Sequence, residues 1–106
     1  MIQIVYWQQM HRVSVSGHAG SAKKGEDLIC AAASMLTYTL AKAVGDLEEL
    51  GALYEAHIDM EDGKAEISCK PKSRMKHAAR IAFDTVMGGF LLLSQKEPDF
   101  VSLRVC

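Results

Sequence analysis

The Asp62-Gly63 dipeptide lies between two alternating segments and limits the fold of this chain more than any other feature. Apolar and polar residues alternate from Leu53 to Met60 and again from Lys64 to Lys70. Asp-Gly in this position is a strong signal of a β-hairpin with a two-residue turn. A hairpin with one apolar face is not stable alone, so we expect it to join a sheet that packs against another layer.

The same alternation appears at the beginning of the chain. Ile2 to Trp7 and Arg12 to Ser16 each alternate, and a turn near Gln9 to His11 separates them, which predicts a second hairpin. Phe100 to Val105 has the composition of a final strand. Because the first four strands form two hairpins, we expect the sheet to be mainly antiparallel.

Two longer segments have the residue spacing of helices. Apolar residues three and four apart follow Asp27, a good N-cap residue, and predict a helix from about Leu28 to Val44. A glycine favours the left-handed conformation that ends many helices, so either Gly45 or Gly51 is expected to close this region.

The second helix is predicted from an N-cap at Ser73 through about Lys96, and Pro98 stops it. Gly88-Gly89 lies within this helix, where each glycine costs about 1 kcal/mol relative to alanine. We therefore expect another backbone to approach closely there, in a dimer or sheet contact, or the helix to kink.

The predicted elements follow the order ββαββαβ. This order is typical of an α+β fold in which a mainly antiparallel sheet packs against two helices. The chain has 106 residues, the usual size of one domain, so residues 1–106 are expected to share a single core.

The formal net charge is -1, so a nucleic acid or an anionic membrane would need a local patch on this protein. The longest apolar run, around Phe90 to Leu93, is far shorter than the roughly 18 residues of a membrane span. With no cationic leader, the sequence predicts a cytoplasmic protein without a membrane partner.

One basic cluster has the composition of a solvated face, and it would also suit ribosomal RNA or an acidic partner. The basic cluster consists of Lys70, Lys72, Arg74, Lys76 and Arg80.

The three cysteines, Cys30, Cys69 and Cys106, are odd in number and widely spaced. Neither a disulfide framework nor a metal site is indicated, and we expect free thiols in a reducing compartment. Cys69 lies on the apolar face of a predicted strand and Cys106 is the last residue, so neither is expected to be catalytic. Three histidines are expected at the surface: His11, His57 and His77.

One loop joins the histidine and the cysteine that are best placed for chemistry. Gly17-His18-Ala19 begins it, and Gly25-Glu26-Asp27-Leu28-Ile29-Cys30-Ala31-Ala32-Ala33-Ser34 follows. With Asp27 as N-cap, Cys30 is the third helical residue, where unpaired N–H groups and the helix dipole stabilise a thiolate. If the loop folds back, the His18 imidazole reaches the thiol, but the spacing alone does not decide this.

These residues also have ordinary structural interpretations. A cysteine beside alanines in a helix is often a small core residue, and a histidine between small residues is often an exposed loop residue. For Asp27 a capping role is the preferred interpretation, and orientation of the His18 imidazole is the alternative. Ser34 lies one turn after Cys30 on the same face, either as a packing residue or as a hydrogen-bonding group near the thiol. Packing and catalysis therefore both remain open.

Gly-His-Ala, a glycine-containing loop and Gly-x-Asp-Leu-Ile-Cys-Ala-Ala-x-Ser resemble the signature of the ribosomal-processing cysteine protease family, Prp. The predicted order of elements resembles the fold of that family over essentially the full chain. The resemblance implies a catalytic dyad of His18 and Cys30. It also implies supporting roles for Asp27 and Ser34 and loop hinges at Gly17 and Gly25.

Members of that family are homodimers that remove a short N-terminal extension from the twenty-seventh large-subunit ribosomal protein, after a pair of phenylalanines. The resemblance therefore implies a cysteine endopeptidase that supports ribosome assembly and needs no metal or organic cofactor. In the expected mechanism the Cys30 thiolate attacks the scissile carbonyl, His18 moves the protons, and N–H groups at Cys30 and the adjoining loop hold the oxyanion. The alternatives are a non-enzymatic ribosome-associated binding module that uses the basic cluster and a thiol redox sensor.

Overall fold

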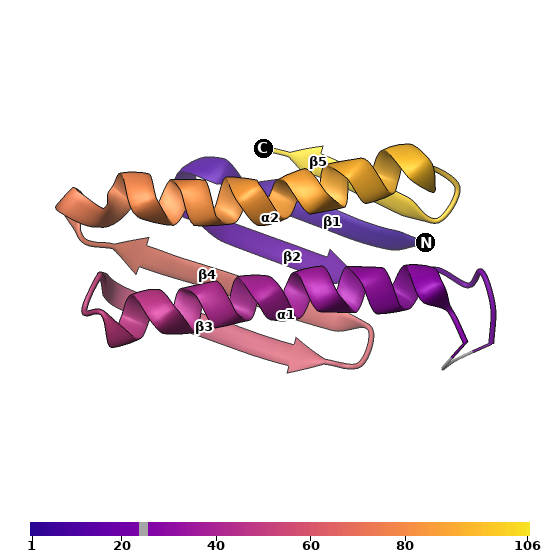
Figure 1. The fold of residues 1–106 in the computed structure, drawn as a ribbon, viewed down its shortest axis with the longest axis horizontal. Coiled ribbons are helices and arrows are strands. Elements are labelled where there is room, and N and C mark those ends of the chain that lie inside the picture. Colours follow the sequence, from indigo (N-terminus) through magenta and orange to yellow (C-terminus); the bar gives the residue numbers. More distant parts are fainter. Residues whose placement is uncertain (24–25) are drawn as a thin grey trace.

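The chain folds into a five-stranded sheet with both helices on one face (Figure 1). The computed structural model describes residues 1–23 and 26–106. The predicted α+β fold and the order ββαββαβ are confirmed. The elements are β1 (Ile2–Trp7), η1 (Gln8–Met10), β2 (Arg12–Ser16), α1 (Leu28–Glu49), β3 (Leu53–Glu61), β4 (Lys64–Pro71), η2 (Ser73–Met75), α2 (Lys76–Lys96) and β5 (Val101–Val105).

The strands lie in the order β3-β4-β2-β1-β5. Both predicted hairpins form, and β2 pairs antiparallel with β4 to join them. Glu61 pairs with Lys64, so Asp62-Gly63 is the two-residue turn between β3 and β4. The exception to the antiparallel pattern is β5, which runs parallel to β1 because the chain crosses over through α2.

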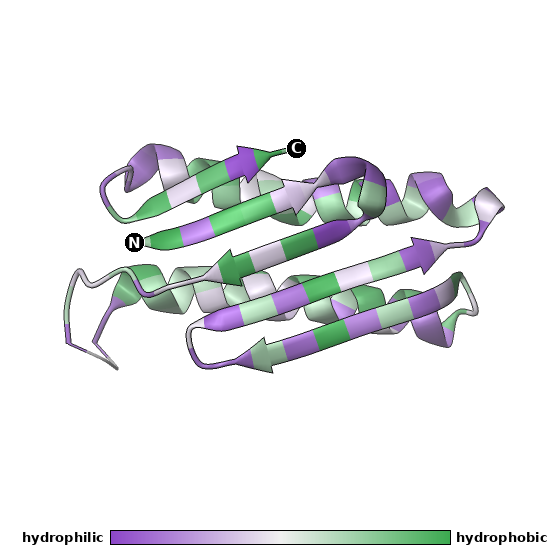
Figure 2. Ribbon diagram, turned by 180° about the vertical axis from the view of Figure 1, so that it is seen from behind, coloured by the Kyte–Doolittle hydropathy of each residue, from purple (hydrophilic) through white to green (hydrophobic). Residues whose placement is uncertain are grey.

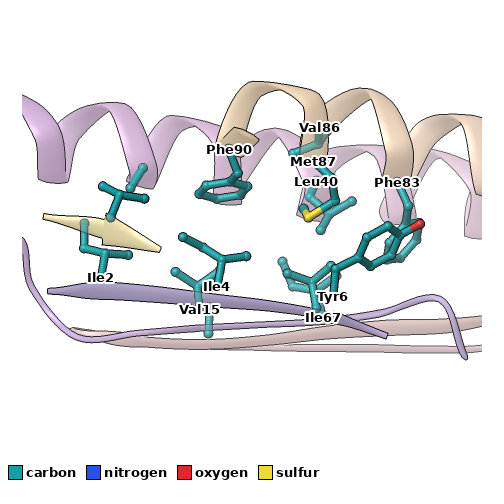
Figure 3. Packing of buried hydrophobic residues seen from close by; sticks show 14 of the residues in the cluster. Ile2, Ile4, Tyr6, Val15, Leu40, Ile67, Phe83, Val86, Met87 and Phe90 are labelled. Carbon is teal, nitrogen blue, oxygen red and sulfur yellow. The ribbon is translucent and has the colours of Figure 1, made fainter. Parts of the chain in front are cut away.

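The core lies between the sheet and the two helices (Figure 3). Ile4 and Tyr6 alternate toward the helices along β1 and are 1% exposed. Phe83 and Phe90 of α2 and Leu40 of α1 pack onto them from above and are equally buried. Full burial of such side chains contributes about 1.5 to 3 kcal/mol each, and it fixes where the helices lie on the sheet.

Both helices differ from their predicted limits. α1 continues through Gly45 and ends at Glu49, with Leu50 as its C-cap, and the expected glycine Gly51 follows with φ of +70°. Gly45 is therefore not the terminator, because the buried Val44 packs on the core and offsets a glycine penalty of about 1 kcal/mol. The predicted N-cap at Ser73 is wrong, since Ser73 begins the 3₁₀ turn η2 and the N-cap of α2 is Met75.

Gly89 allows α1 and α2 to pack closely. An ideal Cβ on Gly89 would lie 2.5 Å from Cδ2 of Leu36 in α1, whereas a Cβ on Gly88 would meet nothing within 4 Å. The expected close approach is thus present, but it comes from a side chain of the neighbouring helix rather than from a backbone.

α1 has the length and apolar composition of a membrane span. The expectation that no segment resembles such a span is therefore wrong for this helix. Its buried residues Ala33, Thr37, Leu40 and Val44 recur along one face and pack toward the sheet. One face of α1 therefore belongs to the core.

The opposite face of the sheet is turned toward the viewer in Figure 2, with the helices behind it. Trp7 and Arg12 are paired there across β1 and β2, and the Arg12 guanidinium lies 4.7 Å from the centre of the Trp7 ring. Arg12 also forms an ion pair with Glu66 of β4 at 3.4 Å. This face is held by polar contacts between neighbouring strands.

Candidate active site

A cavity of about 560 Å³ opens at the end of the sheet where β2 ends, α1 begins and the β3–β4 turn lies. These three parts of the chain meet at the same end of the molecule (Figure 1). His18 and Cys30 both line this cavity. Apolar residues supply much of the remaining wall, among them Ile2, Val15 and Met60.

Cys30 is the third residue of α1 and partly buried beside the core. Its Sγ accepts a hydrogen bond from the backbone amide of Ala19 at 3.3 Å. This contact brings the sulfur against the peptide that follows His18. The alternative of a cysteine sealed in the core does not hold, because the residue lines an open cavity.

Asp27 ties the loop to the beginning of α1. Its Oδ1 accepts hydrogen bonds from the amides of Ile29 and Cys30, each at 3.0 Å, which confirms the predicted N-cap. The same carboxylate accepts the hydroxyl of Ser21 at 2.6 Å and the amide of Ser21 at 3.1 Å. These bonds, the Ser21 hydroxyl first, lower the pKa of Asp27 from 3.8 to about 2. The carboxylate is thus ionised and satisfied by donors beside the thiol.

The Cys30 amide is therefore already bonded to Asp27. We expected this amide to help hold an oxyanion, and in the present conformation that assignment is wrong. The capping carboxylate and an oxyanion would compete for this N–H group, because the carboxylate accepts hydrogen bonds from the unpaired amides of the first helical turn. In the adjoining loop the Ala19 amide faces the sulfur itself, at 3.3 Å from Cys30 Sγ.

His18 lies on the turn between β3 and β4. An ideal Cβ on Gly63 would be only 2.7 Å from Nε2 of His18, so the ring packs directly against this glycine. The amide of Gly17 donates to the carbonyl of Gly63 at 2.8 Å and holds the residue before His18 on the same turn. Neither contact is visible in the spacing of residues along the chain.

Gly17 has φ of +94°, and the carbonyl of Met1 occupies the place of its missing side chain. Only glycine adopts this conformation beside another backbone at no steric cost. Gly25, the second expected hinge, lies outside the described residues. Ser34 lines the same cavity one turn after Cys30, and its hydroxyl has no hydrogen bond within residues 1–23 and 26–106.

The other cysteines and histidines lie away from this cavity. Cys69 is buried, and burial raises the pKa of its thiol to about 11, while Cys106 is exposed. His57 and His77 are exposed as expected. His11 is not a surface residue: it is partly buried, and its ring meets the edge of Phe83 at 5.9 Å between centres. The left-handed backbone of His11, with φ of 48°, turns the ring inward after η1.

Two members of the basic cluster are paired with acids. Lys70 lies 3.4 Å from Glu55, and Arg80 lies 2.8 Å from Asp84. In the part of the chain that the structure describes, no three His, Cys, Asp or Glu side chains come together in a way that would hold a metal ion.

Sequence reasoning missed three contributors to this site. They are Ser21, Ala19 and Gly63, of which the sequence analysis assigns only Gly63 a structural role, in the turn after Asp62. The hydroxyl of Ser21 six residues before an N-cap Asp is a weak signal, because a serine in a loop is common. The contacts of Ala19 and Gly63 involve backbone and ring packing across the fold, which no local pattern encodes.

Comparison with known proteins identifies the family. The family model described as Cysteine protease Prp matches residues 1–102. No curated protein matches the chain. The ribosomal processing protease Prp of S. aureus, solved with a covalently linked product peptide, is 19% identical and has a TM-score of 0.74, covering 99% of this chain and 97% of its own. Its structure with a substrate peptide has 18% identity, a TM-score of 0.68 and the same coverage.

A further similar structure is SMU.848 from Streptococcus mutans, which is 27% identical with a TM-score of 0.66. The similarity covers 99% of this chain and 93% of SMU.848. The fold is therefore shared along the whole length of these proteins. Together with the match over residues 1–102, it shows that the chain belongs to the Prp family of cysteine proteases.

Proposed function

We propose that this protein is a cysteine endopeptidase in which Cys30 is the nucleophile and His18 the general base and acid. The proposed substrate is the precursor of the twenty-seventh large-subunit ribosomal protein, whose N-terminal extension is removed after a Phe-rich hydrophobic segment. The observation that carries the proposal is the hydrogen bond from the Ala19 amide to Cys30 Sγ, in a cavity that His18 also lines.

In this mechanism His18 takes the proton from the Cys30 thiol, and the thiolate attacks the scissile carbonyl carbon. Amides of the loop stabilise the negative oxygen of the tetrahedral intermediate. His18 then gives its proton to the leaving amine, and a thioester with Cys30 remains. His18 next takes a proton from water, whose oxygen attacks the thioester, and the acid product leaves as the thiol takes up a proton again.

Asp27 and Ser34 support this chemistry from the same helix. Asp27 holds the first turn of α1 and the loop in one arrangement, so that the sulfur and the loop amides stay together. Ser34 lines the cavity one turn beyond the nucleophile, where its hydroxyl is available to a bound peptide. Both roles are positioning roles, because neither group is placed to react.

The apolar wall of the cavity supports a substrate with large apolar side chains next to the scissile bond. The S. aureus protein of the same fold is a ribosomal processing protease solved with a substrate peptide. A ribosomal precursor as the substrate also agrees with a cytoplasmic location, which we propose for this chain.

We further propose a homodimer. Leu28 and Met35 lie seven residues apart on one side of α1 and are 83% and 64% exposed. Exposed apolar stripes of this kind mark interaction surfaces. Sedimentation of the wild type and of Met35→Glu tests this, and a wild type that sediments as a monomer at micromolar concentration refutes it.

The function is tested by incubating the purified protein with the precursor ribosomal protein of the same organism and measuring product masses. We expect one cut after the Phe-rich segment in the wild type and none with Cys30→Ala or His18→Ala. Cys106→Ser is the matched control, because it removes an exposed thiol outside the cavity. Undiminished cleavage by Cys30→Ala would refute the proposal. Salt-dependent RNA binding without cleavage would favour the binding module, and reversible oxidation of Cys30 without cleavage would favour the redox sensor.

A further inference from the structure

The contact between Gly63 and His18 places the β3–β4 turn in the wall of the site. An ideal Cβ on Gly63 would lie 2.7, 3.3 and 3.4 Å from Nε2, Cε1 and Cδ2 of the His18 ring. Favourable contacts between heavy atoms of side chains begin at about 3.5 Å. The imidazole therefore fills the space in which any other residue at this position would begin its side chain.

The position of Gly63 is fixed by the sheet. Lys64, the next residue, pairs with Glu61 across the turn and with Ser16 at the end of β2. The carbonyl of Gly63 accepts the amide of Gly17 at 2.8 Å, one residue before His18. The backbone of Gly63 is thus fixed both by the strand pairing of Lys64 and by the hydrogen bond from Gly17, whereas His18 lies on an irregular loop.

The position of the His18 ring depends on packing. Within the described residues no hydrogen bond reaches its side chain, so packing sets its direction. We propose that Gly63 is a positioning residue for the His18 imidazole, because the absence of a side chain there leaves the space that the ring occupies in the wall of the cavity that Cys30 also lines. This inference rests on the proposed function, because it assigns His18 the role of proton carrier.

The test is Gly63→Ala. The new Cβ pushes the ring away while the backbone of the turn stays in place, because the ring is the far end of a side chain that can rotate. A misplacement of about 1 Å costs roughly 100-fold in rate, so we expect kcat to fall by about that factor with little change in KM. The pH profile of Cys30 alkylation by iodoacetamide should move toward the profile of His18→Ala.

Gly51→Ala is the matched control. Gly51 has φ of +70°, close to the +75° of Gly63, but a Cβ there meets nothing within 4 Å. Both variants carry the strain of a left-handed alanine, and the contact with the ring distinguishes them. We expect Gly51→Ala to keep the kcat and the alkylation profile of the wild type. Gly63→Asn is a second variant, since asparagine tolerates the left-handed backbone and still places a Cβ against the ring.

Equal kcat for Gly63→Ala and Gly51→Ala would overturn the inference. So would a loss of folded protein in both Gly63 variants with Gly51→Ala folded, because displacing an exposed ring does not unfold a domain. The ring is also followed directly by NMR: the His18 ring shifts should change in Gly63→Ala and not in Gly51→Ala, and unchanged shifts overturn the contact. Failure of the proposed function is recognised separately, by a wild type that does not cleave or by an active Cys30→Ala.

Discussion

Gly89→Ala is expected to destabilise the protein although alanine is the better helix residue. The new Cβ would lie 2.5 Å from Cδ2 of Leu36, about 1 Å inside a normal carbon contact. Overpacking of this kind costs about 1 to 3 kcal/mol, whereas the gain in helix propensity is about 1 kcal/mol. The net change in the free energy of unfolding is therefore a loss of about 0 to 2 kcal/mol, which urea unfolding followed by circular dichroism measures.

Gly88→Ala is the control for this prediction. A Cβ on Gly88 meets nothing within 4 Å, so this variant should gain the full propensity term of about 1 kcal/mol. The two neighbouring substitutions should then differ by about 1 to 3 kcal/mol. In a Leu36→Ala background Gly89→Ala should become stabilising as well. If Gly89→Ala stabilises the wild type as much as Gly88→Ala does, the proposed close packing of the helices is wrong.

Three further predictions concern the contributions of Asp27, His11 and Tyr6 to the stability of the protein. The folded-state pKa of Asp27 is about 2 against an ordinary 3.8, so its contribution to stability is complete above pH 4 and lost as the pH falls toward 2. The difference in urea midpoint between the wild type and Asp27→Asn should shrink over that range, and a constant difference would contradict this. Burial lowers the pKa of His11, so the unfolded chain binds a proton first as the pH falls below about 6.5, and wild-type stability declines. His11→Asn keeps the left-handed backbone and should flatten that decline, whereas an unchanged slope would place the effect elsewhere. Tyr6→Phe removes the hydrogen bond that the Tyr6 hydroxyl donates to Asp84 at 2.8 Å, and we expect a loss of about 1.5 kcal/mol without any loss of cleavage.

The parts of the fold that depend on near neighbours in the chain were predictable. Asp62-Gly63 specifies a turn and Asp27 specifies a cap, because each signal acts over two or three residues. The parallel pairing of β5 with β1 was not predictable, since it joins residues about 100 positions apart and depends on how α2 crosses the sheet. Of the two glycines expected to close α1, Gly51 does so and Gly45 does not, because tertiary packing of Val44 overrides the preference of Gly45.

The site divides in the same way. The place of Cys30 in the first helical turn follows from Asp27, so the sequence predicts it. The support of His18 by Gly63 depends on the pairing of three strands, which brings residues 45 positions apart into contact. His11 shows the limit most clearly, because a histidine in a polar turn was expected at the surface and its left-handed backbone turns it inward.

The single tryptophan gives this protein a useful optical property. Trp7 lies under Arg12 on the face of the sheet away from the helices and is not among the residues that line the cavity. Fluorescence from this indole therefore reports unfolding of the sheet and is insensitive to a peptide bound near Cys30. Stability and substrate occupancy can then be followed independently in one sample, with a labelled peptide as the second chromophore.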